Sequence, residues 1–476
     1  MTQDALAFPR MEMLDKEQCE AIHLASLEIL RRTGVRIYHE EALDMLRQTD
    51  AVITDDNLVR FPPGLVEWSL AQAPSRVALC RRGSSQVVAP LEGRHVNFGT
   101  GSDCPNYLDP HTGERRPFTI ADVVDAIHIV DDLPELAFCM SMGIPSDIGS
   151  ANPYRHQFAL MLEHTTKPVV FVCNDRADCK AIVAMASAAA GGIDQLRLNP
   201  TLLLYSEPST PLKHSETATG KLLYMAEQAL PIVHSPAPMM GGTAPVTLAG
   251  GLALGNAEVL SSLVMHQLKH PGAPFVYGQG LHHMDMKATI SVYGAPEFQL
   301  ARILVAEMGR FYGLPTWGYA GHSDSCAMDE QAAADAAFSV LVALLTGTNL
   351  VHDVGYLEAG LTTSPEMIVF TAEMISMMRH FMHGTSLNAE SLALDVIHQV
   401  GPGGDFLTTN HTLKHFRKLW QPVLFSRQRA DGWIATGSKR LGQRLREKTL
   451  SILEEHEPEL LPNSVQEEIA YILEND

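Results

Sequence analysis

Short apolar runs separated by helical segments make up the chain from about residue 95 onward. Continuous apolar runs are typical of strands buried on both faces, as in parallel sheets, and successive runs start about 30 to 45 residues apart. Alanine-rich segments with helical spacing lie between them, so the pattern predicts a (β/α)₈ TIM barrel, with a doubly wound open sheet as the alternative. The runs are 96–99, 137–142, 168–173, 201–205, 231–235, 274–277, 314–317 and 349–353.

The two ends of the chain show different patterns. Residues 17–32 have helical apolar spacing, and two short apolar runs flank the turn Asp55-Asp56-Asn57, which predicts a hairpin. We therefore expect a small N-terminal α+β cap (1–90), the barrel (91–384) and a helical C-terminal extension (385–476). The charged, amphipathic tail is suited to packing or to self-association, so we expect a homo-oligomer.

Composition and charge exclude several classes of function. The net charge is −20 and lysines and arginines form no block, which argues against nucleic-acid binding. The seven cysteines are scattered and form no C-x-x-C pair, which favours a reducing compartment over a disulfide framework or a zinc cluster. No phosphate-binding glycine motif follows a run, so no nucleotide is expected.

Nothing in the sequence predicts export or membrane insertion. The first residues lack the apolar core of a signal peptide. The most apolar stretch, 232–254, contains three prolines and four glycines and would make a poor membrane span. We therefore expect a cytoplasmic protein that does not bind a membrane.

Barrel enzymes place their reactive groups just after each strand, so the residues at these positions are the candidates for chemistry. Aromatic residues are 7% of the chain, yet many fall at these ends, and rings around a pocket attract a quaternary ammonium ion. The same rings could simply plug the barrel mouth. The predicted cation site comprises Phe98, Tyr205, Tyr277, Trp317 and Tyr356, with Glu207 adding negative potential.

Other strand ends carry histidines and glycines. His234 and His352 are candidates to hold a substrate carboxylate because no arginine directly follows a strand, although either histidine could equally be a buried structural residue. Gly241 and Gly242 would let a flat ligand approach the backbone. Lysine and cysteine positions do not predict a Schiff base or a thiol nucleophile, so neither a catalytic residue nor a metal ligand is assigned.

Several long motifs resemble the trimethylamine:corrinoid methyltransferase family. They are GGTAPVTLAGGLALGNAEVL (241–260), PGAPFVYG (271–278), YGAPEF (293–298), YGLPTWGYAGHSDSCAMDEQAA (312–333), GTNLVHDVGYLEAG (347–360) and KLWQPVLFSR (418–427). The resemblance implies a (β/α)₈ barrel that passes a methyl group from an amine to the Co(I) of a separate corrinoid protein. Founding members carry pyrrolysine near strand seven, whereas this chain has only standard residues there. It therefore resembles the branch that demethylates quaternary amines, such as glycine betaine.

Such a reaction needs little acid–base chemistry from the protein. A quaternary nitrogen leaves as a neutral tertiary amine, so the protein has mainly to orient the cation. The chain has no D-x-H-x-x-G cobalamin signature, so the corrinoid must come with a partner, and we expect it to dock near Gly241, Gly242, His322 and Asp324. The alternatives are another barrel enzyme, such as a hydrolase or lyase, and a non-catalytic subunit that binds a partner.

Overall fold

Eight short parallel strands form a ring at the centre of the molecule. The computed structural model describes residues 5–149 and 152–475. The strands make two all-parallel sheets, in the orders β10-β7-β20-β19 and β11-β12-β14-β16. Isolated parallel bridges from Cys139 to Val169 and from Tyr277 to Thr316 join the sheets at both edges. The strands are β7 (Asn97–Thr100), β10 (Leu136–Phe138), β11 (Val169–Phe171), β12 (Leu202–Ser206), β14 (Ile232–His234), β16 (Phe275–Val276), β19 (Trp317–Tyr319) and β20 (Leu350–Val354).

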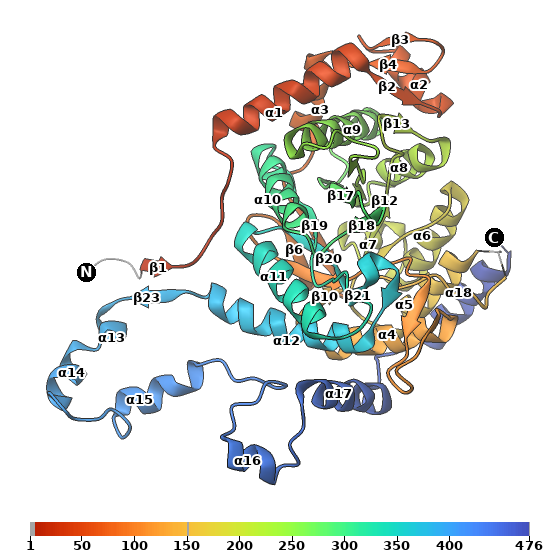
Figure 1. Ribbon diagram of the computed structural model, residues 1–476. Coiled ribbons are helices and arrows are strands. Elements are labelled where there is room, and N and C mark those ends of the chain that lie inside the picture. Colours follow the sequence, from red (N-terminus) through yellow and green to blue (C-terminus); the bar gives the residue numbers. More distant parts are fainter. Residues whose placement is uncertain (1–4, 150–151, 476) are drawn as a thin grey trace.

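Each of these strands overlaps one of the eight predicted runs, although β19 shares only Trp317 with the run 314–317, and a helix follows each strand. The pairings close on themselves, which is consistent with the predicted barrel and leaves none of these strands as the edge of an open sheet (Figure 1). Local sequence signals set both ends of these helices. At the start of α6 the Asp175 side chain accepts hydrogen bonds from backbone N–H groups, and at its end Gly191 adopts φ 80°. The outer helices are α4 (Ile120–Asp132), α5 (Pro153–His164), α6 (Arg176–Ala190), α8 (Glu216–Gln228), α9 (Leu248–Lys269), α10 (Pro296–Phe311), α11 (Glu330–Thr346) and α12 (Pro365–Met382).

Alternate residues of each strand face opposite sides of the ring. One buried cluster contains Val170, Leu203 and Val233, with Trp317 and Leu350, and it fills the interior. The intervening residues pack outward with apolar residues of the helices. A hairpin of β5 (Val77–Cys80) and β6 (Val87–Leu91) supplies further interior residues and plugs the ring, a role that the sequence pattern did not predict.

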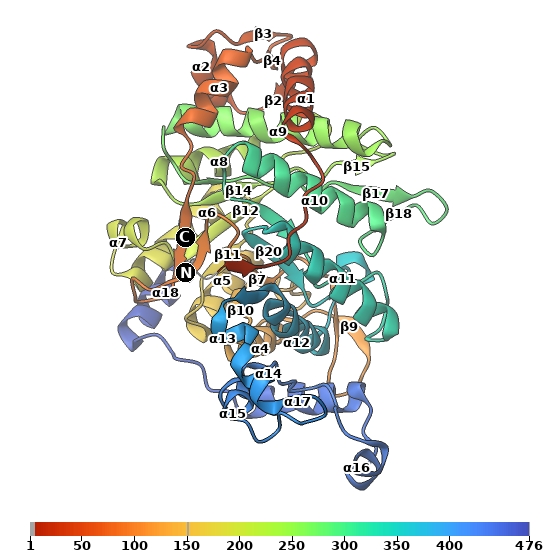
Figure 2. The same cartoon turned by 90° about the vertical axis from the view of Figure 1, so that its left-hand side faces the viewer.

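The N-terminal elements cover one side of the barrel. Helices α1 and α3 pack against α9, and the β3–β4 hairpin forms at the predicted turn, with Asp55 and Asp56 at positive φ (Figure 2). Helix α9 is long and apolar enough to cross a membrane, but 78% of its apolar window is buried inside the protein. The elements are α1 (Lys16–Glu28), the π-helix η1 (Ile29–Thr33), β2 (Val35–Ile37), α2 (Glu40–Arg47), β3 (Val52–Thr54), β4 (Leu58–Arg60) and α3 (Pro63–Gln72).

The C-terminal region begins with an arm that extends away from the barrel (Figure 1). Its apolar side chains are widely exposed, for example Leu394 at 68% and Leu407 at 82%. The chain then returns, and α17 packs on α12 and α4 while α18 packs on α6. The elements are β23 (Thr385–Leu387), which pairs with β1 (Ala5–Ala7), α13 (Ala389–Leu392), α14 (Leu394–Val400), α15 (Asn410–His415), η3 (Phe416–Lys418), α16 (Ala430–Ala435), α17 (Leu441–Glu455) and α18 (Asn463–Asn475).

Short strands after the barrel strands build the rim. One rim sheet has the order β15-β17-β18 and another the order β21-β22-β8-β9. The remaining elements are β8 (Asn106–Leu108), β9 (Arg115–Pro117), α7 (Ile193–Leu198), β13 (Lys213–His214), β15 (Met239–Met240), β17 (His282–Asp285), β18 (Ile290–Val292), β21 (Tyr356–Leu357), η2 (Glu358–Gly360) and β22 (Thr362–Thr363).

Candidate active site

A cavity of about 200 Å³ lies at the carboxyl ends of the barrel strands. Its walls come from the segments after β7, β12, β14, β16, β19 and β20, and from the segment that leads into α10. Parallel strands direct all their carboxyl ends to one face of a barrel, so residues far apart in sequence converge there.

Five aromatic side chains line this cavity: Tyr205, Tyr293, Phe298, Tyr319 and Tyr356. The rings of Tyr293 and Phe298 stack with centroids 4.8 Å apart, and Phe298 meets Tyr319 edge-on at 6.1 Å. A Cβ at Gly280 would lie only 2.8 Å from the Tyr319 hydroxyl oxygen, so the glycine lets this ring reach the wall. The result is a small compartment with several π faces.

Three carboxylates share the cavity with these rings: Asp103, Glu207 and Asp353. Burial raises the pKa of Asp103. Glu207 is reached by solvent through the cavity but is closely surrounded by protein, and this burial raises its pKa against the opposing hydrogen bond from the Tyr205 hydroxyl. Two of the three carboxylates therefore hold their negative charge less readily than they would in water.

Asp353 has the opposite tendency. Burial favours its neutral form, but His352 and His322 outweigh burial and lower its pKa to about 2. The Nδ1 atoms of His352 and His322 lie 2.9 Å and 3.6 Å from its two carboxylate oxygens. Asp353 also adopts φ 79°, an unfavourable conformation for a residue other than glycine, and it is held there by the packed barrel mouth.

Positive side chains are scarce at this site. Among the lining residues that the structure describes, only His282 and His352 can carry positive charge. Arg302 is buried nearby, but its guanidinium lies over the rings of Phe298 and Tyr319, at 4.4 and 4.6 Å, and donates to the backbone carbonyls of Gln279 and Leu281. The cavity therefore presents mainly π faces and acidic groups.

Four of the predicted substrate-binding residues meet in the cavity, namely Tyr205, Glu207, His352 and Tyr356. Trp317 does not line it. The indole is fully buried in the barrel interior and stacks on His352 at 4.3 Å and on Tyr205 at 5.3 Å. Trp317 therefore packs against two residues that line the cavity, His352 and Tyr205.

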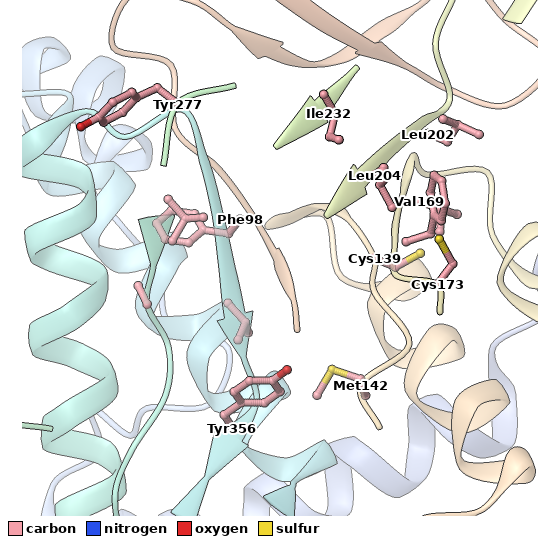
Figure 3. Close-up of a cluster of buried hydrophobic side chains, with 14 of the residues drawn as sticks. Phe98, Cys139, Met142, Val169, Cys173, Leu202, Leu204, Ile232, Tyr277 and Tyr356 are labelled. Atoms are coloured by element: carbon pink, nitrogen blue, oxygen red, sulfur yellow. The ribbon is translucent and has the colours of Figure 1, made fainter. Parts of the chain in front are cut away.

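Phe98, Tyr277 and His234 lie outside the cavity. Phe98 and Tyr277 belong to the apolar cluster between strands and helices (Figure 3). The Tyr277 hydroxyl donates to Asn256 Oδ1 on α9 at 2.8 Å, and His234 stacks on His214 at 6.1 Å. Neighbouring side chains of a strand face opposite sides of the barrel. The prediction found the correct strand ends for these three residues, but their side chains face the outer side.

The predicted docking residues separate into two groups. Gly241 and Gly242 are exposed on the rim, and Gly241 adopts φ 88°. His322 is fully buried beside the rings of Tyr293 and Phe298, so it cannot contact a docked partner. Asp324 accepts hydrogen bonds from the backbone N–H groups of Tyr293 and Gly294, at 2.7 and 2.8 Å, and so positions a cavity wall.

The sequence analysis did not assign several lining residues to the site. Tyr293 and Phe298 belong to the motif YGAPEF, but they enter the cavity well after the end of β16, where only the first few residues had been searched. Tyr319 is the last residue of β19, which begins where the predicted run 314–317 ends. Asp103 follows β7 and Asp353 lies one residue before the end of β20, and the carboxylate–histidine pairing at Asp353 could have drawn attention to it.

Within 5–149 and 152–475, histidine, cysteine, aspartate and glutamate side chains do not form a group of three that could hold a metal ion.

Comparison with known proteins places the whole chain in one group. A family model described as trimethylamine methyltransferase matches residues 3–475. A trimethylamine methyltransferase of Desulfitobacterium hafniense (strain DSM 10664 / DCB-2) is 32% identical over 96% of this chain and 92% of its own length. A glycine betaine methyltransferase of D. hafniense (strain Y51) is 30% identical, with 89% of each chain covered.

A solved structure shares the fold. The hydroxylamine complex of MtmB aligns over 95% of this chain and 90% of its own, with a TM-score of 0.53 and 12% sequence identity. At that identity the likeness concerns the architecture alone.

Proposed function

Since this chain belongs to the trimethylamine methyltransferase family, we propose that it takes a methyl group from a quaternary amine and delivers it to the Co(I) of a separate corrinoid protein. The observation that carries the proposal is the cavity of five rings and three carboxylates at the carboxyl ends of the barrel strands. A quaternary ammonium ion offers no hydrogen bond, so π faces and negative potential are the means of binding it.

The proposed roles of the residues follow from their positions. The rings orient the cation, and Glu207 and Asp103 add negative potential. The corrinoid supplies the nucleophile when its carrier protein is docked. The departing tertiary amine is neutral, so the chain need not donate a proton.

The candidate substrate of the sequence analysis is glycine betaine, and the relative named as a glycine betaine methyltransferase supports testing it first. The relative named as a trimethylamine methyltransferase makes trimethylamine the second compound to test. His352 is the one predicted carboxylate ligand that remains at the cavity, and it is already paired with Asp353.

The rim around Gly241 and Gly242 is the proposed approach for the corrinoid. Both residues are exposed, and Met286 and Val246 beside them expose 60% and 68% of their surface. A flat macrocycle needs small and apolar neighbours of this kind to come close to the cavity. No cobalt ligand from this chain is required.

The function is tested by mixing the protein with reduced free cob(I)alamin and a panel of amines, and following methylcobalamin by absorbance. The panel contains glycine betaine, trimethylamine, tetramethylammonium and choline, and boiled protein is the control. Formation of methylcobalamin with at least one compound supports the proposal. If the protein binds a cation but transfers no methyl group, the transfer assay is repeated with the cognate corrinoid protein. Continued absence of transfer would then indicate a non-catalytic subunit. Neither binding nor transfer would favour a different barrel enzyme.

A further inference from the structure

The charges around the cavity are unbalanced. Three carboxylates line it, against two histidines. The Nδ1 atom of His352 lies 2.9 Å from a carboxylate oxygen of Asp353, while its buried Nε2 atom has no hydrogen-bond partner among the described residues. Arg302 is turned away behind the rings, where backbone carbonyls engage it. This balance suits a cation, but it leaves little to neutralise a negative group on the substrate.

Asp103 has a free acceptor at this site. Its Oδ2 accepts a hydrogen bond from the Ser102 hydroxyl at 2.9 Å, whereas its buried Oδ1 has no hydrogen-bond partner. Hydrogen bonding from the Ser102 and Tyr154 hydroxyls opposes the rise that burial causes in the pKa of Asp103, but no donor of the described residues is placed in hydrogen-bond geometry at Oδ1. Leaving a buried carboxylate oxygen without a donor is costly, so the site is suited to a ligand that supplies one.

The hydroxyl donors of the cavity are already engaged. The Tyr205 hydroxyl donates to Glu207, and the Tyr356 hydroxyl donates to the carbonyl oxygen of Ser102. The Tyr319 hydroxyl shares a hydrogen bond of 3.2 Å with Ser235. A substrate hydroxyl would meet a free acceptor at Asp103, whereas a substrate carboxylate would meet three like charges and, among the described lining residues, only the imidazoles of His282 and His352 as possible donors.

We infer that the cavity selects a methylated ammonium ion whose remaining substituent is uncharged and carries a hydroxyl, which it donates to Asp103, and that it disfavours carboxylated quaternary amines. This inference rests on the proposed function and narrows its substrate class. Choline is the probe with a hydroxyl, tetramethylammonium is the probe without a donor, and glycine betaine is the carboxylated probe.

Binding to the protein alone, measured by calorimetry at pH 7.5, provides a test that is independent of the corrinoid. We expect choline to bind at least tenfold more tightly than glycine betaine and several-fold more tightly than tetramethylammonium. Asp103→Asn should reduce the preference for choline over glycine betaine by about tenfold. Asparagine suits the left-handed backbone at this position, where φ is 68°, so the variant should fold.

Glu297→Gln is the matched control, since Glu297 is an exposed carboxylate at the start of α10 that does not line the cavity. It should leave all three affinities unchanged. Glycine betaine binding as tightly as choline would overturn the inference, as would an unchanged preference in Asp103→Asn. In either case methyl transfer from any cation of the panel would leave the proposed function standing, whereas absence of both binding and transfer would refute that function itself.

Discussion

Replacing Trp317 by alanine should mainly destabilise the protein, because the indole fills the barrel interior instead of lining the cavity. The side chain is fully buried among strand residues such as Phe138 and Leu350, and His352 and Tyr205 stack on it. Truncating a buried tryptophan to alanine costs about 3–5 kcal/mol, from lost burial and from the cavity that remains.

The expected shift in melting temperature follows from the size of the chain. An unfolding entropy of roughly 2.1 cal/mol/K per residue, applied to 476 residues, gives about 1 kcal/mol/K near 60 °C. The loss therefore corresponds to a fall in Tm of about 3–5 °C. Losing the aromatic contacts to Tyr205 and His352, worth about 0.5–1.5 kcal/mol each, should weaken cation binding by about tenfold.

The assay measures Tm by scanning calorimetry and tetramethylammonium affinity by titration on the same preparations. Trp317→Phe keeps most of the ring and should retain the affinity within threefold. Trp433→Ala is the control for removing an indole, because Trp433 belongs to α16, which extends away from the barrel in Figure 1, and its indole donates to the carbonyl of Lys439. An unchanged Tm with a hundredfold loss of affinity in Trp317→Ala would refute this reasoning and show direct contact with the cation.

Three further predictions concern groups outside the cavity. Tyr277→Phe removes the hydrogen bond to Asn256 and should lower the free energy of unfolding by about 1–3 kcal/mol, which is measured as a lower Tm. Cation affinity should stay within twofold of wild type, and a tenfold loss of affinity would place Tyr277 at the site. Burial raises the pKa of Glu258 to about 8, so stability should fall as pH rises from about 4.3 through 8, and Glu258→Gln should stabilise the protein more at pH 9 than at pH 6 in urea unfolding. A Cβ at Gly242 would meet the flexible ends of Met239 and Met284 at 3.3 and 3.6 Å and the Met239 carbonyl oxygen at an ordinary 3.6 Å, so Tm and cation affinity of Gly242→Leu should hold while transfer to the corrinoid protein drops at least tenfold; wild-type transfer would exclude docking at this loop.

Element order and strand positions could be predicted because they depend on local pattern. The eight apolar runs matched the eight barrel strands, and the hairpin at Asp55 and Asp56 formed where turn residues interrupt two short runs. The β5–β6 plug was missed, since nothing local distinguishes a hairpin that enters a barrel from one on a surface.

The candidate site was only partly predictable, because a strand end does not reveal which face a side chain takes. Tyr205 and Tyr277 both lie near strand ends, yet one ring faces the cavity and the other faces α9. A shift of one residue reverses the side, and strands of two to five residues give too little alternation to fix it. Tyr293 reaches the cavity from the end of the rim strand β18, far along the chain from the end of barrel strand β16, which local sequence cannot show.

By itself, the sequence determined that this chain forms repeated β-then-α units and carries the motifs of its family, because periodicity and motif spacing are properties of neighbouring residues. Only the tertiary structure decided which rings enclose the cavity and that Asp103, Glu207 and Asp353 meet there without a lysine or arginine among the described lining residues. Ring closure brings together side chains as far apart in the chain as Asp103 and Asp353, and their mutual distances set the potential that a substrate experiences.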